Sequence, residues 1–554
     1  MKRTRYRMTA ILLCVLFVLN GCTAQTAGET SSTAETAGGS GASAVSAIDT
    51  DALFSDRDIE GTYDESAAIP IQLNGDSASC DSDAVIMESG QIIIGTEGVY
   101  LLSGTLTDGQ IVVNAGNTDK VQLVLGGADI TSSTSAAIYV MAADKVFLTL
   151  AEGAKNTLTN GGEYVDIDDN NIDAVIFSKA DLTLNGSGSL TVNAQAGHGV
   201  VSKDDLIVTG GSYTISAASH GLSGKDCVAI AGGAFSITSG KDGIHAENSD
   251  DPSLGYLYIA DGSYSITSQG DSISANGALQ INRGTFNLYT GEGSASVDMT
   301  GSDGFGQMEG RRPDDSAAVQ MEPTAETAAE DSVSQKGIKG ENAYIINGGD
   351  FTIDSADDCL HAGGEMVLAA GTFTLRSGDD AVHCDDALAI QSGTFTIPYC
   401  YEGIEGLSIT IEDGIFDITS HDDGLNSAGG ADSSGFGGFG GRPQDAFTAS
   451  SDSFITINGG MFTIVSSGDC VDSNGALTIN GGTLNLTCNG NGNTALDCDG
   501  TYTNNGGDVT TNDGSENNPG QMGNGPGGQQ GMGGPGGRGE PGVREEQKTT
   551  NSTV

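Results

Sequence analysis

Between residues 343 and 430 the chain alternates apolar and polar residues in short runs that repeat about every 22 positions. Each row contains a strand-like run, a glycine turn, a second run headed by an aromatic residue, and an acidic turn before a short aliphatic run. The aromatic position is filled by Phe351, Phe373, Phe395 and Phe416. A fixed period without a helix-length apolar stripe is typical of a solenoid. Each row is therefore predicted to be one coil of a parallel β-helix, with equivalent residues stacked about 4.8 Å apart.

The aromatic position continues on both sides of this stretch. It is occupied upstream by Tyr213, Phe235, Tyr264 and Phe286, and downstream by Phe462 and then Leu484. Two Gly-rich stretches, residues 301–341 and 431–452, interrupt the series and are predicted to leave the coil as long loops. We expect the all-β solenoid to span residues 119–511, after a capping β region at 51–118 and before a disordered Gly/Pro-rich tail at 512–554.

The N-terminus has the pattern of an export signal, with four basic residues before an apolar run at 8–19. The following Leu19-Asn20-Gly21-Cys22 resembles a bacterial lipobox, so residues 1–22 are predicted to be a lipoprotein signal peptide that leaves Cys22 acylated. An ordinary secretory signal and an uncleaved anchor are the alternatives. Residues 23–50 are predicted to be a flexible tether. The expected location is the extracellular face of the cell membrane, as a lipid-anchored monomer.

The charge balance limits the class of partner. Asp and Glu number 74 against 22 Lys and Arg, which gives a formal net charge of −52 and argues against nucleic acid. Cations are the natural counterparts of such a surface. Eight cysteines follow Cys22. Export permits disulfides, but spacing does not reveal pairing, and burial as small free thiols is the alternative.

The acidic turns of successive rows fall in one column. The predicted metal ligands are Asp357, Asp358, Asp379, Asp380, Glu402, Asp422 and Asp423, and the column continues to Asp469. Carboxylates stacked about 4.8 Å apart repel one another unless a cation lies among them. Calcium, which accepts six to eight oxygen ligands, suits this arrangement. Two alternatives stay open: Asp-Gly pairs simply suit tight turns and internal ladders, and His361 and His383 indicate zinc.

Several motifs resemble a family of exported carbohydrate-binding β-helix proteins from clostridia that degrade plant cell walls. They are DKVQLVLGGADIT from 119, DKVFLTLAEG from 144, SKADLTLNGSGSLTV from 178, GHGVVSKDDLIVTGGSYTISAASHGLSGKD from 197, and the Asp-Gly turn in KDGI at 241–244. The resemblance covers about residues 75–510. It implies a right-handed parallel β-helix that binds calcium and cell-wall polysaccharides such as cellulose or acidic pectin. It also implies a fold like that of the β-helix polysaccharide lyases, without clear lyase activity.

The function predicted from the sequence is therefore calcium-dependent binding of a cell-wall polysaccharide. Arg376, His383, Tyr401 and Glu405 are the predicted sugar contacts, and because Trp is absent we expect calcium bridges and hydrogen bonds to outweigh aromatic stacking. One alternative is a calcium-dependent pectate-type lyase, for which Arg376 is the sole candidate base between Lys339 and Arg442. The other is a non-catalytic surface adhesin or matrix protein.

Overall fold

The computed structural model describes residues 47–88, 90–162, 164–165, 170–299, 334–428 and 452–519. The described residues belong to one compact unit. The predicted signal peptide with Cys22 and most of the tether lie outside the described residues, as do most of both predicted excursions and residues 520–554. No helix in the described part is both long and apolar enough to cross a bilayer.

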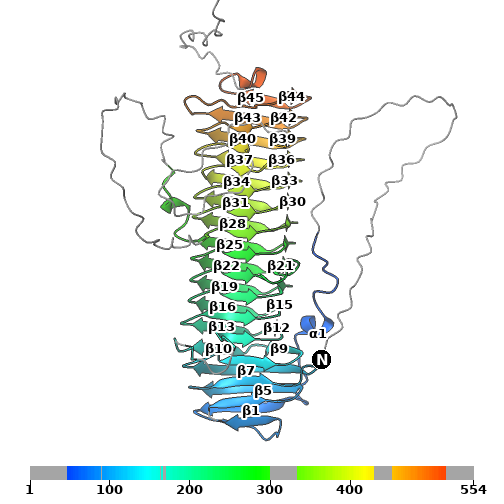
Figure 1. The fold of residues 1–554 in the computed structure, drawn as a ribbon, viewed down its shortest axis with the longest axis vertical. Helices are drawn as coiled ribbons and strands as arrows, with labels where there is room; N and C mark the ends of the chain where they lie inside the picture. The colour runs from blue at the N-terminus through cyan, green and yellow to red at the C-terminus, as the bar shows by residue number, and fades with distance from the viewer. Residues whose placement is uncertain are drawn as a thin grey trace, which may run out of the picture. The chain divides into compact units, whose positions relative to one another are not determined.

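The repeating unit is a coil of three short strands joined by tight turns, as β14, β15 and β16 illustrate. Each strand pairs in parallel with the equivalent strand of the next coil, so that Val200 lies opposite Leu222, Leu206 opposite Val228 and Tyr213 opposite Phe235. Figure 1 shows these strands stacked in chain order. The prediction of a parallel β-helix with about 22 residues per coil is confirmed.

The strands form three faces along the stack. The first, which we call the turn face, comprises β4 (Gln91–Ile94), β6 (Gln110–Asn114), β8 (Ile138–Ala142), β11 (Ala174–Ser178), β14 (His198–Ser202), β17 (Leu222–Gly224), β20 (Ile244–Ala246), β23 (Ile273–Ala275), β26 (Ile338–Gly340), β29 (Leu360–Ala362), β32 (Val382–Cys384), β35 (Ile404–Glu405), β38 (Leu425–Ser427) and β41 (Val471–Ser473). The second comprises β9 (Lys145–Leu150), β12 (Asp181–Gly186), β15 (Asp205–Val208), β18 (Cys227–Ile230), β21 (Tyr256–Ile259), β24 (Leu279–Ile281), β27 (Tyr344–Ile346), β30 (Met366–Leu368), β33 (Ala387–Ile390), β36 (Ser408–Ile411), β39 (Phe454–Ile457), β42 (Ala476–Ile479) and β44 (Tyr502–Asn504). The third comprises β10 (Lys155–Asn160), β13 (Ser189–Ala194), β16 (Ser212–Ala217), β19 (Ala234–Ser239), β22 (Ser263–Ser268), β25 (Thr285–Thr290), β28 (Asp350–Ser355), β31 (Thr372–Ser377), β34 (Thr394–Tyr399), β37 (Ile415–Thr419), β40 (Met461–Ser466), β43 (Thr483–Cys488) and β45 (Asp508–Thr511).

The core is built from columns of identical or similar apolar side chains. The predicted aromatic column runs from Tyr213 to Phe462, with neighbouring ring centroids 4.5 to 5.2 Å apart and ring planes within 14° of parallel. Apolar residues alternate with outward polar ones along the third-face strands, which is the pattern expected for strands buried on one face. All eight cysteines of the described residues are free thiols and six are buried, so no disulfide links these coils.

Parallel coil pairing begins upstream of residue 119. β1 (Ile69–Gly75) and β5 (Gly98–Leu106) are already parallel, and the long β7 (Lys120–Ser132) continues the stack. Antiparallel pairing is confined to the start of the described chain, where β1 meets β2 (Ala78–Ser79) and β3 (Val85–Glu88) meets β4. Most of the range 51–118, predicted to be a capping β region of the solenoid, thus pairs in parallel with the coils that follow it.

Two terminal segments predicted to be flexible or disordered pack on the coils. Ile48, within the expected tether, donates its backbone N–H to Gln280, and α1 (Asp56–Glu60) buries Asp58 against Lys145. At the other end, residues 512–519 include a short 3-10 helix at Ser515–Asn517. Ser515 Oγ accepts the Leu496 N–H at 3.0 Å, and Asp513 accepts the Ala495 N–H at 2.8 Å. These contacts give hydrogen-bond partners to backbone N–H groups at the end of the stack, which explains why residues 512–519 pack there.

Candidate functional site

One position recurs in the turn that precedes each strand of the turn face. Strand register places one equivalent residue in each coil, two positions before Val200, Leu222 and the residues that pair with them in later coils. We call these residues the turn column: His198, His220, Asp242, Asp271, Lys336, Asp358, Asp380, Glu402, Asp423, Asp469 and Thr494. Lys336 stands in this column, one coil before Asp358. It lies inside the predicted excursion 301–341, so the coil resumes earlier than expected.

Many side chains of the turn column accept a hydrogen bond from the backbone of the following coil. Asp358 accepts the Asp380 N–H at 3.0 Å, and Asp423 accepts the Asp469 N–H at 2.6 Å. Asp242 and Asp271 accept the corresponding N–H groups of Asp271 and Lys336 at 2.9 and 2.8 Å. The acidic residues therefore have a structural role as internal ladders, which was the alternative to metal binding.

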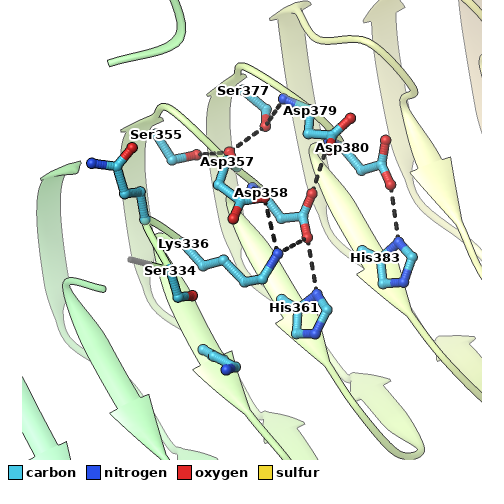
Figure 2. A network of polar contacts seen from close by, with 12 residues as sticks. Ser334, Lys336, Ser355, Asp357, Asp358, His361, Ser377, Asp379, Asp380 and His383 are labelled. Carbon is cyan, nitrogen blue, oxygen red and sulfur yellow. Dashed lines mark hydrogen bonds and ion pairs between the residues drawn. The ribbon is translucent and has the colours of Figure 1, made fainter. Parts of the chain in front are cut away.

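The predicted ligands Asp357, Asp358 and Asp379 come together in the centre of the column, where Figure 2 shows their network. The buried Lys336 lies among them, with its Nζ 2.9 Å from Asp357 Oδ1 and 2.7 Å from Asp358 Oδ2. His361 Nδ1 is 2.9 Å from the same Asp358 oxygen. Burial raises the pKa of Asp358, but Lys336 and His361 outweigh it and hold that pKa well below its usual value. The chain thus supplies a cation of its own beside Asp357 and Asp358, which the prediction of a divalent ion did not include.

The next coil brings Asp380, His383 and Glu405 together. His383 Nδ1 lies 2.9 Å from both Asp380 Oδ2 and Glu405 Oε2, and its Nε2 lies 3.1 Å from Asp385 Oδ1. Burial lowers the pKa of His383, but these carboxylates raise it well above its usual value. The ring is 3% exposed, which does not favour its predicted role as a sugar contact.

The other predicted sugar contacts lie nearer the surface. Arg376 is on the outward side of β31, with its guanidinium carbon 5.2 Å from the centre of the Tyr399 ring. Tyr401, in the turn before β35, and Glu405, at the end of β35, are partly exposed. The structure thus brings Arg376 against Tyr399, and Glu405 against His383.

A third group, which we call the C-terminal acidic cluster, consists of Asp469, Asp472 and Asp497. One carboxylate oxygen from each lies within 4.8 Å of the other two. Asp423 adjoins the cluster through its bond to the Asp469 N–H. Burial and neighbouring carboxylates raise the pKa of Asp469 to about 7 and that of Asp423 well above its usual value. The predicted ligand set stops at Asp423 and omits this cluster, although the column spacing extends to Asp469.

A buried amide lies beside this cluster. Asn426 pairs in register with Asp472 of the next coil, and its Nδ2 donates to Glu402 Oε2 at 2.9 Å. Its Oδ1 is buried and finds no hydrogen-bond donor among the described residues. Buried acceptors are almost always satisfied, so an acceptor without a donor next to carboxylates indicates a missing positive partner. The acidic clusters are thus possible metal sites, and they differ in how much of their negative charge is balanced by cationic side chains of the described residues.

Comparisons with known proteins place the chain among proteins of related sequence. A family model described as a carbohydrate-binding domain-containing protein matches residues 88–381 and 379–518. A protein of that description from Acetivibrio thermocellus is 48% identical over 189 residues, or 34% of this chain and 66% of the relative, so the chain spans just under two thirds of the relative's length. A solved structure of the polysaccharide lyase-like protein from C. thermocellum, a gadolinium derivative, is 37% identical with a TM-score of 0.40, covering 40% of this chain and 92% of that one.

Proposed function

Because the chain belongs to the family of carbohydrate-binding domain-containing proteins, we propose that it binds an acidic cell-wall polysaccharide through calcium. The ions would be held by the C-terminal acidic cluster. In this proposal the protein binds the polymer without cleaving it.

The observation that carries the proposal is the lack of Lys and Arg among the described residues of the coils around that cluster. Residues 452–519 contain no Lys, Arg or His, and residues 400–428 contain only His421. The central group of carboxylates has Lys336 and His361, whereas Asp469, Asp472 and Asp497 bring three carboxylates within 4.8 Å of one another. A divalent cation removes the repulsion that raises these pKa values.

The donor set favours calcium over a transition metal. Every candidate ligand is a carboxylate or amide oxygen, including the unpartnered Asn426 Oδ1. Calcium prefers oxygen donors and tolerates irregular geometry, and it keeps positions for water or a further ligand. When bound, it would supply the positive charge that this part of the surface lacks.

Charge also selects the substrate class. A chain of net charge −52 repels an acidic polymer unless a cation lies between them. Calcium with open coordination positions can accept a uronate carboxylate, so an acidic, pectin-like polysaccharide is the partner that gains most from the site. A neutral glucan would gain no such bridge.

Binding without cleavage is supported by the surroundings of the candidate base. Arg376 lies over the Tyr399 ring, three coils upstream of Asp469 in the C-terminal acidic cluster. The described residues from 377 onward contain no Lys or Arg. A lyase needs a base close to the metal-bound uronate, and the cluster offers only carboxylates.

Affinity electrophoresis in gels containing polygalacturonate tests the proposal. Retardation should appear with calcium, disappear with chelator, and fall strongly in Asp472→Asn and Asp497→Asn. Asp508→Asn, which changes an exposed carboxylate on β45, is the matched control and should migrate like the parent protein. Equal mobility with and without polygalacturonate at saturating calcium would refute binding, and retardation that survives chelation would refute the calcium bridge. New ultraviolet absorbance from unsaturated uronate products would replace binding by lyase activity.

We also propose that Cys22 anchors the protein to the outer face of the membrane. This rests on the lipobox-like sequence Leu19-Asn20-Gly21-Cys22 alone. Cys22→Ala should release the protein into a soluble fraction, and retention in the membrane fraction would count against the anchor.

A further inference from the structure

Three stacked histidines occupy the turn face far upstream of the C-terminal acidic cluster. The rings of His198 and His220 are 5.0 Å apart, and those of His220 and His245 are 4.4 Å apart. The chain has six histidines, so half of them lie in this one stack. Asp242 lies beside the stack, with its Oδ2 3.4 Å from His220 Nδ1 and 2.7 Å from His245 Nδ1.

The contact between His245 and Asp242 is close but incomplete. The two atoms are 2.7 Å apart, yet they do not have hydrogen-bond geometry, and His245 Nδ1 is buried without a hydrogen-bond partner among the described residues. His220 Nδ1 accepts the Asp242 N–H at 3.2 Å, which leaves that nitrogen unprotonated. Two ring nitrogens and one carboxylate oxygen thus face one another, and the closest pair among them lacks hydrogen-bond geometry.

From this geometry we infer that His220, Asp242 and His245 form a binding site for a transition-metal ion of the Zn²⁺ type. The site is separate from the proposed calcium cluster and requires a different ion. Its donor set is two imidazoles and one carboxylate, which zinc accepts readily and calcium does not favour.

The distances suit this ion with small adjustments. Zinc lies about 2.0 to 2.1 Å from nitrogen and oxygen ligands, so tetrahedral ligand atoms lie about 3.3 Å from one another. The 3.4 Å and 2.7 Å separations from Asp242 Oδ2 bracket that value. The weak 3.2 Å bond at His220 Nδ1 is the one that the metal would replace. The three side chains are 14 to 17% exposed, so a water molecule can reach the fourth position.

The other ring nitrogen of His245 contacts a carboxylate, as is usual for a histidine that binds a metal. Its Nε2 lies 3.1 Å from Glu247 Oε2, on the ring side opposite Nδ1. A histidine that ligates a metal through one nitrogen usually donates the other N–H to a carboxylate, which orients the ring and raises its basicity. Glu247 is therefore assigned as a positioning residue for His245.

The histidine–carboxylate group around His383 differs from this site because both ring nitrogens of His383 have hydrogen-bond partners. His383 Nδ1 makes a hydrogen bond of 2.9 Å with Asp380, its Nε2 makes one of 3.1 Å with Asp385, and the ring is sealed from solvent. Its nitrogens are satisfied without an ion. His383 thus serves as an internal control for any imidazole–carboxylate pair that is only structural.

The test is a titration of the full soluble chain with Zn²⁺, in calcium at a concentration that saturates oxygen-only sites. We expect one zinc per chain by calorimetry and by elemental analysis after gel filtration. His220→Gln and His245→Gln should each weaken binding by about 100-fold or more, and Glu247→Gln by about 10- to 100-fold. His198→Gln, within the stack but outside the ligand set, and His383→Gln should keep the parent affinity. Circular dichroism confirms that each variant is folded, and Asp242→Asn replaces any variant that is not.

Substitution by Co²⁺ identifies the ligands independently. Visible absorption of a low-coordinate Co²⁺ without a thiolate charge-transfer band supports the site, whereas such a band would assign the metal to one of the free cysteines and overturn the inference. Absence of bound zinc, or zinc that is unaffected by His220→Gln and His245→Gln, would overturn it as well. Calcium-dependent retardation by polygalacturonate is measured separately, so failure of the zinc site leaves the proposed function untouched.

Discussion

Replacing Lys336 by Met should destabilise the centre of the solenoid, because it removes the cation that two buried aspartates share. The side chain of Lys336 is 8% exposed, and its Nζ lies 2.9 Å from Asp357 and 2.7 Å from Asp358. Methionine keeps most of the volume and flexibility of the lysine stem, so the change tests charge more than packing.

The loss of stability in Lys336→Met depends on the contacts that Asp357 and Asp358 keep without the lysine. Breaking a buried ion pair by removing one partner typically costs about 3 to 5 kcal/mol. His361 still faces Asp358, and the Asp358 N–H still donates to Asp357, so we expect a cost of about 3 kcal/mol, at the lower end of that range. Lys339→Met is the matched control: its ion pair with Glu341 is partly exposed and should contribute about 0 to 1 kcal/mol.

The pH dependence gives a second check with a definite sign. In the parent protein burial raises the pKa of Asp358, but Lys336 and His361 outweigh it, so the folded pKa is lowered and this contribution to stability is present above about pH 4. Without Lys336 burial should dominate and raise the folded pKa. The folded variant then holds more protons than the unfolded chain above pH 4, and its stability falls as pH rises. The gap from the parent should be narrow at pH 4 and widest near pH 8.

Hydrogen exchange of the β26 and β29 amides, with thermal unfolding at pH 4 and pH 8, measures both quantities. Millimolar calcium should recover part of the loss in Lys336→Met alone, because that change leaves a carboxylate group without a cation. A cost below about 1 kcal/mol at pH 8, equal to that of Lys339→Met, would show that Lys336 does not neutralise the column.

Three further changes test other parts of the structure. Asp58→Ala removes a buried carboxylate 2.8 Å from Lys145 Nζ and should expose residues 47–62 to proteolysis at a cost of about 3 to 5 kcal/mol; unchanged cleavage would contradict this. Phe373→Ala, within the aromatic column, should cost about 3 to 5 kcal/mol by urea unfolding, whereas Tyr289→Ala at the surface should cost little. Asp204→Asn should raise the melting temperature at pH 8 but not at pH 4. Burial and neighbouring carboxylates raise the pKa of Asp204 to about 6, so its ionisation destabilises the folded state as pH rises through the window from about 4 to 6, and an equal shift at both values would refute this.

The solenoid could be predicted from the sequence because its pattern is local and repeated. Phe351, Phe373 and Phe395 recur at the coil length, and stacking of equivalent residues follows from that period. The contacts of α1 and of residues 512–519 could not be predicted in this way. Asp58 contacts Lys145 and Thr183, and Ser515 contacts Leu496, and the repeat period of the sequence predicts none of these contacts.

The candidate site was predicted in position but not in chemistry. The column of carboxylates is present where the spacing indicated, yet Lys336 was missed because it follows a stretch without coil pattern and was assigned to the excursion. A signal existed: Lys336 precedes Asp358 by one coil length and so occupies the same column. The burial of His383 and the missing donor of Asn426 Oδ1 depend on side-chain packing, which alternation of apolar and polar residues does not report.

The turn column shows why one structural position can serve different partners. In many coils the column side chain accepts the N–H of the next coil, so an acceptor is useful there, whether imidazole or carboxylate. That requirement makes the column acidic, and the charge must then be offset locally, because stacked carboxylates about 4.8 Å apart repel. In the centre Lys336 offsets it from within the column. Beyond residue 452 the described chain has no basic residue, so among the described coils an ion from solution would have the most to gain there.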